Sequence, residues 1–245
     1  MHSNRNTRPS YVIVIPIYNE ELSIKDTMDF LRNFRFQHKY LFVDDGSTDK
    51  SVEIVSEYLG NLDANLLTFD RNQGYGKACI EGGKWAANND YEWVLFADSD
   101  LTNNFNEVDN FVNVMNEENY CIKGSRFLQK NSLSSLSNKR KVWTIAGRYI
   151  ARLFFLGMAD DPTNGFRAIR TQFYLSHNFQ SNDFSLILEE MYRISKNRFK
   201  VVNVSVTLTE RSPNQRDSSF HYSPLQIWNY FKWCLLNIMP ITKRV

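Results

Sequence analysis

The feature that most constrains this chain is a regular alternation of short, apolar, β-branched runs with longer segments of helical periodicity. The first run, 11–15, is followed by a segment, 20–33, that carries Leu22, Ile24, Met28 and Leu31 on one face. Further runs at 40–43, 65–69 and 92–96 are separated by helical patterns at 50–59 and 74–88. Such alternation is typical of βαβ units. We therefore expect an α/β fold, a mostly parallel sheet flanked by helices in a single domain.

The second half of the chain has less regular patterns. They predict helices at 105–116, 142–156, 184–197 and 225–238, and strands at 120–123 and 200–208. A serine-rich loop at 132–138 is predicted to be a lid, and 160–167 to be a turn. In helix 142–156, Arg148 and Arg152 are one turn apart and project on one side. The expected organisation is a polar tail at 1–10, one domain at 11–220 and an aromatic, amphipathic helix at 221–245.

The composition is that of a soluble globular protein, because 42% of the 245 residues are hydrophobic and 23% are charged. The formal net charge of +2 gives no bulk electrostatic reason to expect nucleic-acid binding. No apolar run approaches the ~20 residues of a membrane span. The three cysteines are widely separated and lack metal-ligand spacing, so we expect them to be reduced and the protein to be cytoplasmic.

Acidic residues follow three of the predicted strands. Asp98 and Asp100 come directly after the run 93–96, Asp44 and Asp45 follow the second strand, and Tyr18 and Glu20 follow the first. The carboxyl ends of parallel strands meet at one edge of a sheet, so these side chains are expected to share a crevice. A nucleotide explains the set: carboxylates accept from the base and ribose, and Asp98 and Asp100 hold Mg²⁺ or Mn²⁺ against a diphosphate. The alternative for the Asp-Ser-Asp segment alone is an ordinary turn.

The sequence lacks the glycine motifs of dinucleotide-binding and P-loop proteins. Instead, four motifs occur in order: 14–20 (VIPIYNE), 43–49 (VDDGSTD), 72–77 (NQGYGK) and 97–100 (ADSD). Together they resemble the successive motifs of family 2 glycosyltransferases with the GT-A fold. Within that family, 124–127 (GSRF) and 161–167 (DPTNGFR) are similar to dolichyl-phosphate mannose synthases and bacterial polyprenyl-phosphate glycosyltransferases. The resemblance runs from about 11 to 211.

The resemblance implies roles for individual residues. The nucleotide would be bound by Pro16, Tyr18, Glu20, Asp44, Asp45, Lys77 and Asp98. Asp98 and Asp100 would face the metal and the diphosphate, and both would be catalytic together with Arg126 and Glu190. The acceptor or sugar phosphate would be bound by Arg126, Arg140, Arg167, Arg211 and Ser218. For the arginines, the alternative is a solvated surface position or a structural ion pair.

The resemblance also implies a reaction in which a lipid phosphate attacks the anomeric carbon of a nucleotide-diphosphate sugar and inverts it. A phosphate monoester is already ionised near pH 7, because its second pKa is about 6, so no strong base is needed. Glu189 and Glu190 would then position the acceptor or brace an arginine. The rival is a transferase that extends a surface or capsular glycan at a sugar hydroxyl, with Glu189 or Glu190 as the base. A nucleotide-binding scaffold protein is a third class.

The predicted C-terminal helix is aromatic nearly all round, with Trp228, Tyr230, Phe231 and Trp233 among leucines and isoleucines. Together with Lys232, Lys243 and Arg244 it would suit the interface of a membrane, where a polyprenol is found, and the protein would be peripheral on the cytoplasmic face. The alternative is that this helix packs on the sheet or on a partner subunit.

Overall fold

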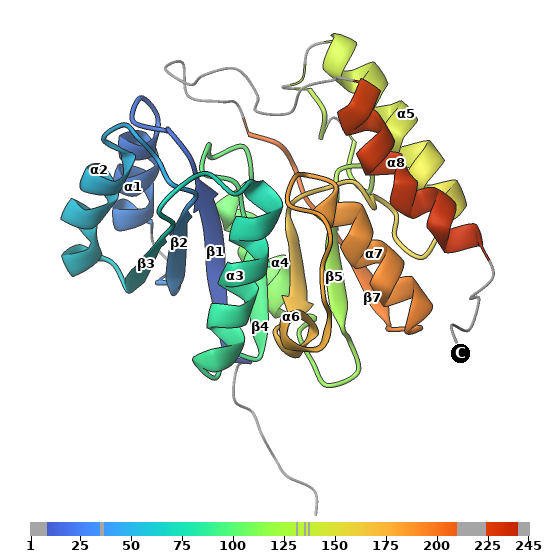
Figure 1. Ribbon diagram of the computed structural model, residues 1–245, viewed down its shortest axis with the longest axis horizontal. Coiled ribbons are helices and arrows are strands. Elements are labelled where there is room, and N and C mark those ends of the chain that lie inside the picture. Colours follow the sequence, from blue (N-terminus) through green and yellow to red (C-terminus); the bar gives the residue numbers. More distant parts are fainter. Residues whose placement is uncertain are drawn as a thin grey trace, which may run out of the picture.

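The computed structural model describes residues 9–34, 37–130, 132–134, 136, 138–209 and 224–239. The described part forms one seven-stranded, mostly parallel sheet with flanking helices, in the strand order β3-β2-β1-β4-β6-β5-β7 (Figure 1). The strands are β1 (Tyr11–Ile17), β2 (Tyr40–Asp44), β3 (Ala64–Thr68), β4 (Trp93–Phe96), β5 (Cys121–Ser125), β6 (Arg167–Arg170) and β7 (Val201–Ser205). The helices are α1 (Ile24–Asn33), α2 (Ser51–Tyr58), α3 (Tyr75–Asn88), α4 (Val108–Val112), α5 (Asn138–Phe154), α6 (Gln172–Ser176), α7 (Leu186–Lys196) and α8 (Pro224–Ile238). Turns of 3-10 helix lie at Leu59–Asn61 and Phe105–Glu107.

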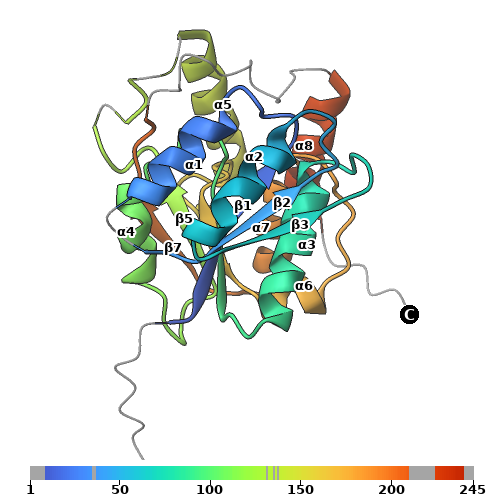
Figure 2. The same cartoon turned by 90° about the vertical axis from the view of Figure 1, so that its left-hand side faces the viewer.

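The first four strands are parallel, and their side chains divide the core into two layers. In β1, Ile13 and Ile15 pack against α1, α2 and α4, whereas Val12 and Val14 pack against α3 and α6. Figure 2 shows the sheet between these two sets of helices. Strands buried on both faces read as continuous apolar runs, which is why β1, β2 and β4 are evident in the sequence.

The other half of the sheet contains an antiparallel strand. β6 runs antiparallel to both of its neighbours, β4 and β5, and β7 runs parallel to β5. A third cluster of buried side chains joins α5, α7 and α8, and includes Phe155, Met191 and Trp233. The Trp233 indole donates a hydrogen bond of 2.9 Å to Ser181 Oγ. One side of the C-terminal helix therefore packs against the rest of the domain, which was one of the two alternatives that its sequence allowed.

Several predicted elements differ from the observed ones. The strand β6 and the helix α6 were not predicted, and the helix expected at 105–116 is a 3-10 turn followed by the short α4. Asn116 ends this region, because its side chain accepts the backbone N–H groups of Glu118 and Asn119 in place of a continued helix. The helix expected at 20–33 begins at Ile24, and the one expected at 142–156 begins at Asn138.

Some predictions fall partly or wholly on residues outside the described ranges. The lid expected at 132–138 includes the undescribed residues 135 and 137, and the tail at 1–10 is described only from Pro9. No helix in the described part of the chain combines the length and the apolar character needed to cross a membrane.

Candidate active site

The carboxyl ends of β1, β2 and β4 meet at one edge of the sheet, as the sequence predicts. In the ladders, Ile17 lies opposite Asp44, and Val14 lies opposite Phe96. The Ala97 N–H donates to the Val14 carbonyl at 3.1 Å, so the contact between this segment and β1 continues up to the residue before Asp98. The connections after β1 and β2 are at the top of Figure 1. Open α/β sheets bind ligands at this edge.

The connections after β1 and β2 are held to each other by hydrogen bonds. The Asn19 N–H donates to Ser47 Oγ (2.9 Å), and the Thr48 N–H donates to Asn19 Oδ1 (2.8 Å). The Glu20 N–H donates to Ser51 Oγ (2.7 Å), and Glu20 Oε2 accepts from Ser23 Oγ (2.9 Å). Asn19 has a φ of 51°, a left-handed conformation that asparagine tolerates better than most residues. Tyr18 and Glu20 therefore lie on a loop of defined shape.

Asp44 and Asp45 are both buried, and each accepts backbone N–H groups. The Asp44 carboxylate accepts from the Ser47 N–H at 3.1 and 3.2 Å. The Asp45 carboxylate accepts from the Gln73 N–H (2.6 Å) and the Gly74 N–H (2.8 Å), so it joins the end of β2 to the loop before α3. Burial raises the pKa of Asp45, and these two hydrogen bonds oppose the rise.

Asp98 and Asp100 lie on a short loop after β4. Asn103 Oδ1 accepts the Asp98 N–H (2.6 Å), and Asp100 Oδ1 accepts from the Thr102 N–H (3.1 Å) and hydroxyl (2.5 Å). Among the described residues, no three His, Cys, Asp or Glu side chains are grouped to hold a metal ion. Two carboxylates fit a Mg²⁺ or Mn²⁺ ion whose other ligands are diphosphate and water oxygens, since Mg²⁺ in proteins is commonly bound by one or two carboxylates plus substrate phosphates.

Opposite Asp98 lies the loop 160–165, which precedes β6. Asp161 is fully buried and accepts two hydrogen bonds from Arg126, at 2.6 Å from Nε and 2.9 Å from Nη2. Arg126 also donates to the Thr163 hydroxyl at 3.1 Å. The Arg126 charge and its hydrogen bonds hold the pKa of Asp161 below its usual range, against the effect of burial. Arg126 is thus part of the wall of the site, through a two-pronged ion pair.

Four more cationic side chains hold this loop. Arg148 and Arg152 both donate to Asp160 Oδ1 at 2.7 Å, as expected from their position on one side of α5. Arg167 donates to the Gly165 carbonyl (2.8 Å), and the fully buried Lys123 donates to the Asn164 carbonyl (2.5 Å). Burial lowers the pKa of Lys123 to about 8. Asp160 balances the charges of Arg148 and Arg152, and Glu190 balances that of Arg167, so these side chains hold the loop chiefly through ion pairs and hydrogen bonds.

A recess of about 140 Å³ lies between the loop that carries Asp98 and the loop 160–165. Asp98 forms part of its lining, and the other lining residues are Tyr75, Thr163, Gly165, Phe184, Ile187 and Tyr230. The rings of Tyr75 and Phe184 stack at a centroid distance of 4.4 Å, and the Tyr230 hydroxyl donates to the Thr163 carbonyl at 3.2 Å. The recess has one carboxylate and an aromatic wall, a combination suited to binding a small polar group such as a sugar ring.

Glu189 and Glu190 lie on α7, and both are buried. Glu190 forms a two-pronged ion pair with Arg167, whose Nη2 is 2.8 Å from Glu190 Oε1, and it accepts the Tyr174 hydroxyl at 2.6 Å. Glu189 accepts from Arg193 at 2.6 and 2.9 Å and from the backbone N–H groups of Gln180 and Ser181. Each glutamate therefore braces an arginine in the protein interior.

Other predicted site residues lie outside the recess. Lys77 is paired with Glu81 along α3 at 2.8 Å. Arg140 lies in the first turn of α5, away from the residues that line the recess. Arg211 and Ser218 lie outside the described residues. The roles of all four in binding stay predictions.

A second hollow, of about 360 Å³, adjoins the wall formed by Arg126. Its lining includes the described part of the predicted lid, and consists of Arg126, Phe127, Gln129, Ser132, Leu133, Ser134 and Lys141. The buried Ser132 hydroxyl donates to the Arg126 carbonyl, which ties the predicted lid to the end of β5.

The residues that sequence reasoning missed belong mainly to the aromatic wall and to Lys123. Tyr75 stands inside the quoted motif 72–77, and Tyr230 stands in the predicted C-terminal helix, but neither was assigned to a site. The position of Tyr75 between two glycines was an available signal, since glycine allows close approach of another segment. Gly76 packs against the backbone of 181–183, which brings Phe184 to Tyr75.

Two characterised relatives align with parts of this chain. The undecaprenyl-phosphate 4-deoxy-4-formamido-L-arabinose transferase of Photorhabdus laumondii is 31% identical over 132 residues, covering 52% of this chain and 39% of the relative. The polyprenol monophosphomannose synthase of Mycolicibacterium smegmatis is 25% identical over 206 residues, covering 82% of this chain and 77% of the relative. The first match thus spans less than half of the relative's length.

Solved structures share the fold. Glucosyl-3-phosphoglycerate synthase from Mycobacterium tuberculosis, in a complex with Mn²⁺, UDP and glucosyl-3-phosphoglycerate, superposes with a TM-score of 0.60 at 18% identity, covering 96% of this chain and 82% of that one. The model of glycosyl transferase family 2 matches residues 12–179, which include β1 to β6 and the loops that carry Asp44, Asp98 and Asp161. The sheet, the acidic edge and this match lead to one conclusion: the chain belongs to glycosyl transferase family 2.

Proposed function

We propose that this protein is an inverting glycosyltransferase that moves a sugar from a nucleotide-diphosphate sugar to a polyprenyl phosphate. An oxygen of the acceptor phosphate attacks the anomeric carbon, the bond from that carbon to the diphosphate breaks, and the nucleoside diphosphate leaves with the electron pair. Family membership and the named activities of the two relatives support the donor and acceptor classes. The nucleotide would lie over the ends of β1 and β2, with its diphosphate toward Asp98 and Asp100.

A divalent cation fits this arrangement. Asp98 and Asp100 would hold Mg²⁺ or Mn²⁺, which would neutralise charge on the departing diphosphate. The chain's own residues would do the rest. The recess bounded by Asp98, Thr163, Gly165 and the ring of Tyr75 would hold the sugar. Glucosyl-3-phosphoglycerate synthase, which has the same fold, was crystallised with Mn²⁺ and UDP, and this shared fold supports the proposal of a cation at this edge.

The burial of both candidate bases is the observation that favours a phosphate over a sugar hydroxyl as the acceptor. Transfer to a sugar hydroxyl requires a group that removes a proton at the attacking oxygen. Glu189 and Glu190 are almost fully buried and ion-paired, so each lacks the exposure that a base for an entering acceptor needs. A phosphate monoester needs no such base, because its second pKa of about 6 leaves it ionised at neutral pH.

The acceptor phosphate would enter from the hollow lined by Arg126 and Lys141. Arg126 lines this hollow and donates to Thr163, which lines the recess, so a phosphate in the hollow would approach the donor sugar from the acceptor side. The lipid tail of a polyprenyl phosphate lies in a membrane, so the reaction would take place at a membrane surface, which we propose to be the cytoplasmic one. Arg140, on the first turn of α5, would lie near the same entrance.

The test is a panel of nucleotide sugars with Mn²⁺ and a water-soluble, short-chain polyprenyl phosphate, following the release of nucleoside diphosphate. The double variant D98A/D100A is the inactive control. Release that requires one donor and the lipid phosphate, and that the control lacks, is the expected result. Release stimulated by a glycan hydroxyl and not by the lipid phosphate would replace the polyprenyl acceptor with a surface polysaccharide. Binding of nucleotide without any turnover would point to a scaffold protein.

A further inference from the structure

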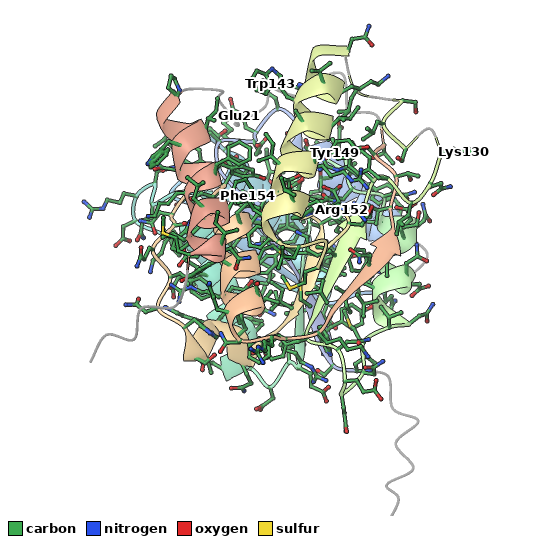
Figure 3. The ribbon with its side chains drawn as sticks, turned by 90° about the vertical axis from the view of Figure 1, so that its right-hand side faces the viewer. Glu21, Lys130, Trp143, Tyr149, Arg152 and Phe154 are labelled. Atoms are coloured by element: carbon green, nitrogen blue, oxygen red, sulfur yellow. The ribbon has the colours of Figure 1, made fainter. Side chains whose placement is uncertain are left out.

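The helix α5 presents an apolar stripe to solvent. Its most exposed large side chains recur every three or four residues, which places them on one side of the helix. Leu153 is 73% exposed and Leu156, just beyond the helix, is 87% exposed. The other members of this outer stripe are Val142, Ile145 and Tyr149, and it is flanked by the exposed Trp143 and Ile150. Figure 3 looks onto this side of the molecule, where α5 runs beside α8.

The inner side of α5 is the more polar one. Arg148 is buried there, donates to Asp160 and lies over the ring of Phe127 at 4.1 Å. Ala151, Phe155 and the half-buried Phe154 add apolar contact on this side. A helix of a globular protein normally turns its apolar side toward the core, whereas α5 carries large apolar side chains on its outer side as well. An exposed apolar patch of this kind marks an interaction surface.

Basic residues predominate around the outer stripe, although Arg148 and Arg152 are ion-paired with Asp160. The segment 119–159 contains eight basic residues and no acidic residue, in a chain whose total charges nearly balance. Lys130 is exposed on the loop before α5, and the Arg152 side chain is 44% exposed on the flank of the stripe. A positive, apolar surface suits a partner that is negative and apolar at once.

We propose that the outer stripe of α5 docks on the surface of a membrane that contains anionic lipids. The aromatic and aliphatic side chains would enter the interface between head groups and acyl chains, and the basic flanks would contact lipid phosphates. A second copy of this chain fits the same stripe less well. A two-fold contact through α5 would bring the basic flanks of the two copies together, and like charges across an interface oppose association.

The position of α5 connects this surface to the site. Lys141, on the first turn of the helix, lines the hollow that also contains Arg126, while Val142 and Ile145 begin the outer stripe. A lipid phosphate at the membrane surface would therefore lie within one helix turn of the hollow. The purpose of this docking surface rests on the proposed function, but docking itself is measured without donor or acceptor, so each proposal can fail alone.

The test is co-sedimentation of the full chain with vesicles, without nucleotide sugar or polyprenyl phosphate. One set contains phosphatidylcholine only, and the other contains phosphatidylcholine with 30% phosphatidylglycerol. We expect binding to the anionic vesicles that weakens as salt is raised. The variant V142E/L153E places two carboxylates on the outer stripe, and we expect its partition to fall at least tenfold. The matched control is Leu175→Glu on α6, an exposed leucine far from α5 in Figure 1, which should bind like the wild type.

Circular dichroism and thermal unfolding verify that each variant is folded, and turnover with a water-soluble acceptor should be the same in V142E/L153E as in the wild type. Equal vesicle binding by V142E/L153E and the wild type would overturn the proposal. So would a wild type that binds neither set of vesicles. A wild-type dimer in light scattering that V142E/L153E converts to a monomer, with no vesicle binding, would assign the outer stripe to a second copy of the chain.

Discussion

Replacing Glu190 by glutamine tests whether this residue braces Arg167 or removes a proton. Both side chains of the pair are only 1% exposed, and the carboxylate also accepts the Tyr174 hydroxyl. Glutamine leaves the Arg167 charge buried without a countercharge, and breaking a buried pair in this way costs about 3–5 kcal/mol. In a chain of this size, with about 2–4 °C per kcal/mol, the melting temperature should fall by ~6–20 °C.

The assay is thermal unfolding followed by circular dichroism, together with turnover measured well below the melting temperature of the variant. If Glu190 is a brace, the folded Glu190→Gln enzyme keeps substantial turnover. The double variant R167M/E190L removes both charges and should recover much of the lost stability, although it also loses the hydrogen bond from Arg167 to Gly165. A melting temperature within 2 °C of the wild type, or a loss of turnover in a fully folded Glu190→Gln, would refute this reasoning.

Three further predictions address the loop, the recess and the acidic edge. Lys123 is protonated in the unfolded chain up to pH 10.5 but in the folded protein only up to pH about 8. Between these pH values the unfolded chain binds the extra proton, so the free energy of unfolding of the wild type, relative to that of Lys123→Met, should rise by about 3 kcal/mol in urea titrations. A difference that stays constant with pH would contradict this prediction. A β-carbon on Gly165 would be 3.6 Å from the Tyr75 hydroxyl, an ordinary contact, so Gly165→Ala should keep the melting temperature of the wild type. Because the added methyl group would occupy part of the recess, kcat/KM should fall about tenfold. Unchanged kinetics would show that the sugar does not bind in the recess. Asp98→Asn and Asp100→Asn should each lower turnover by roughly 100-fold and weaken Mn²⁺ binding in calorimetry; activity without added metal in either variant would exclude the assigned role.

The sequence predicts the acidic edge of the sheet well because simple rules govern it. β1, β2 and β4 are buried on both faces and read as apolar runs, and parallel strands necessarily bring their carboxyl ends together. The convergence of Asp44, Asp45 and Asp98 follows from that alone. The hydrogen bonds of Asp45 to the loop before α3 do not, since they depend on how two segments 28 residues apart approach each other.

The half of the sheet that contains β5, β6 and β7 was less predictable because tertiary contacts override local pattern there. β6 is four residues long and has an arginine at each end, which is not a strand signal. Its ends are accommodated in the sheet because Arg167 pairs with Glu190 and Arg170 lies over the Trp93 ring at 4.7 Å. The periodicity of α5 correctly predicts a helix, but periodicity does not say which side faces the core. The buried contact of Arg148 with Asp160 decides that.

The antiparallel pairing of β5 and β6 has a consequence for how enzymes of this design can diversify. The two strands are neighbours, with Lys123 opposite Arg167, so everything from 126 to 166 is one long hairpin connection. It begins and ends at adjacent points of the sheet. Changes in its length or composition therefore leave the register of β1, β2 and β4 intact, because the cost of closing a loop grows only slowly with its length. Under the proposed function, exchanging this connection between relatives would change the acceptor and leave the donor site unchanged.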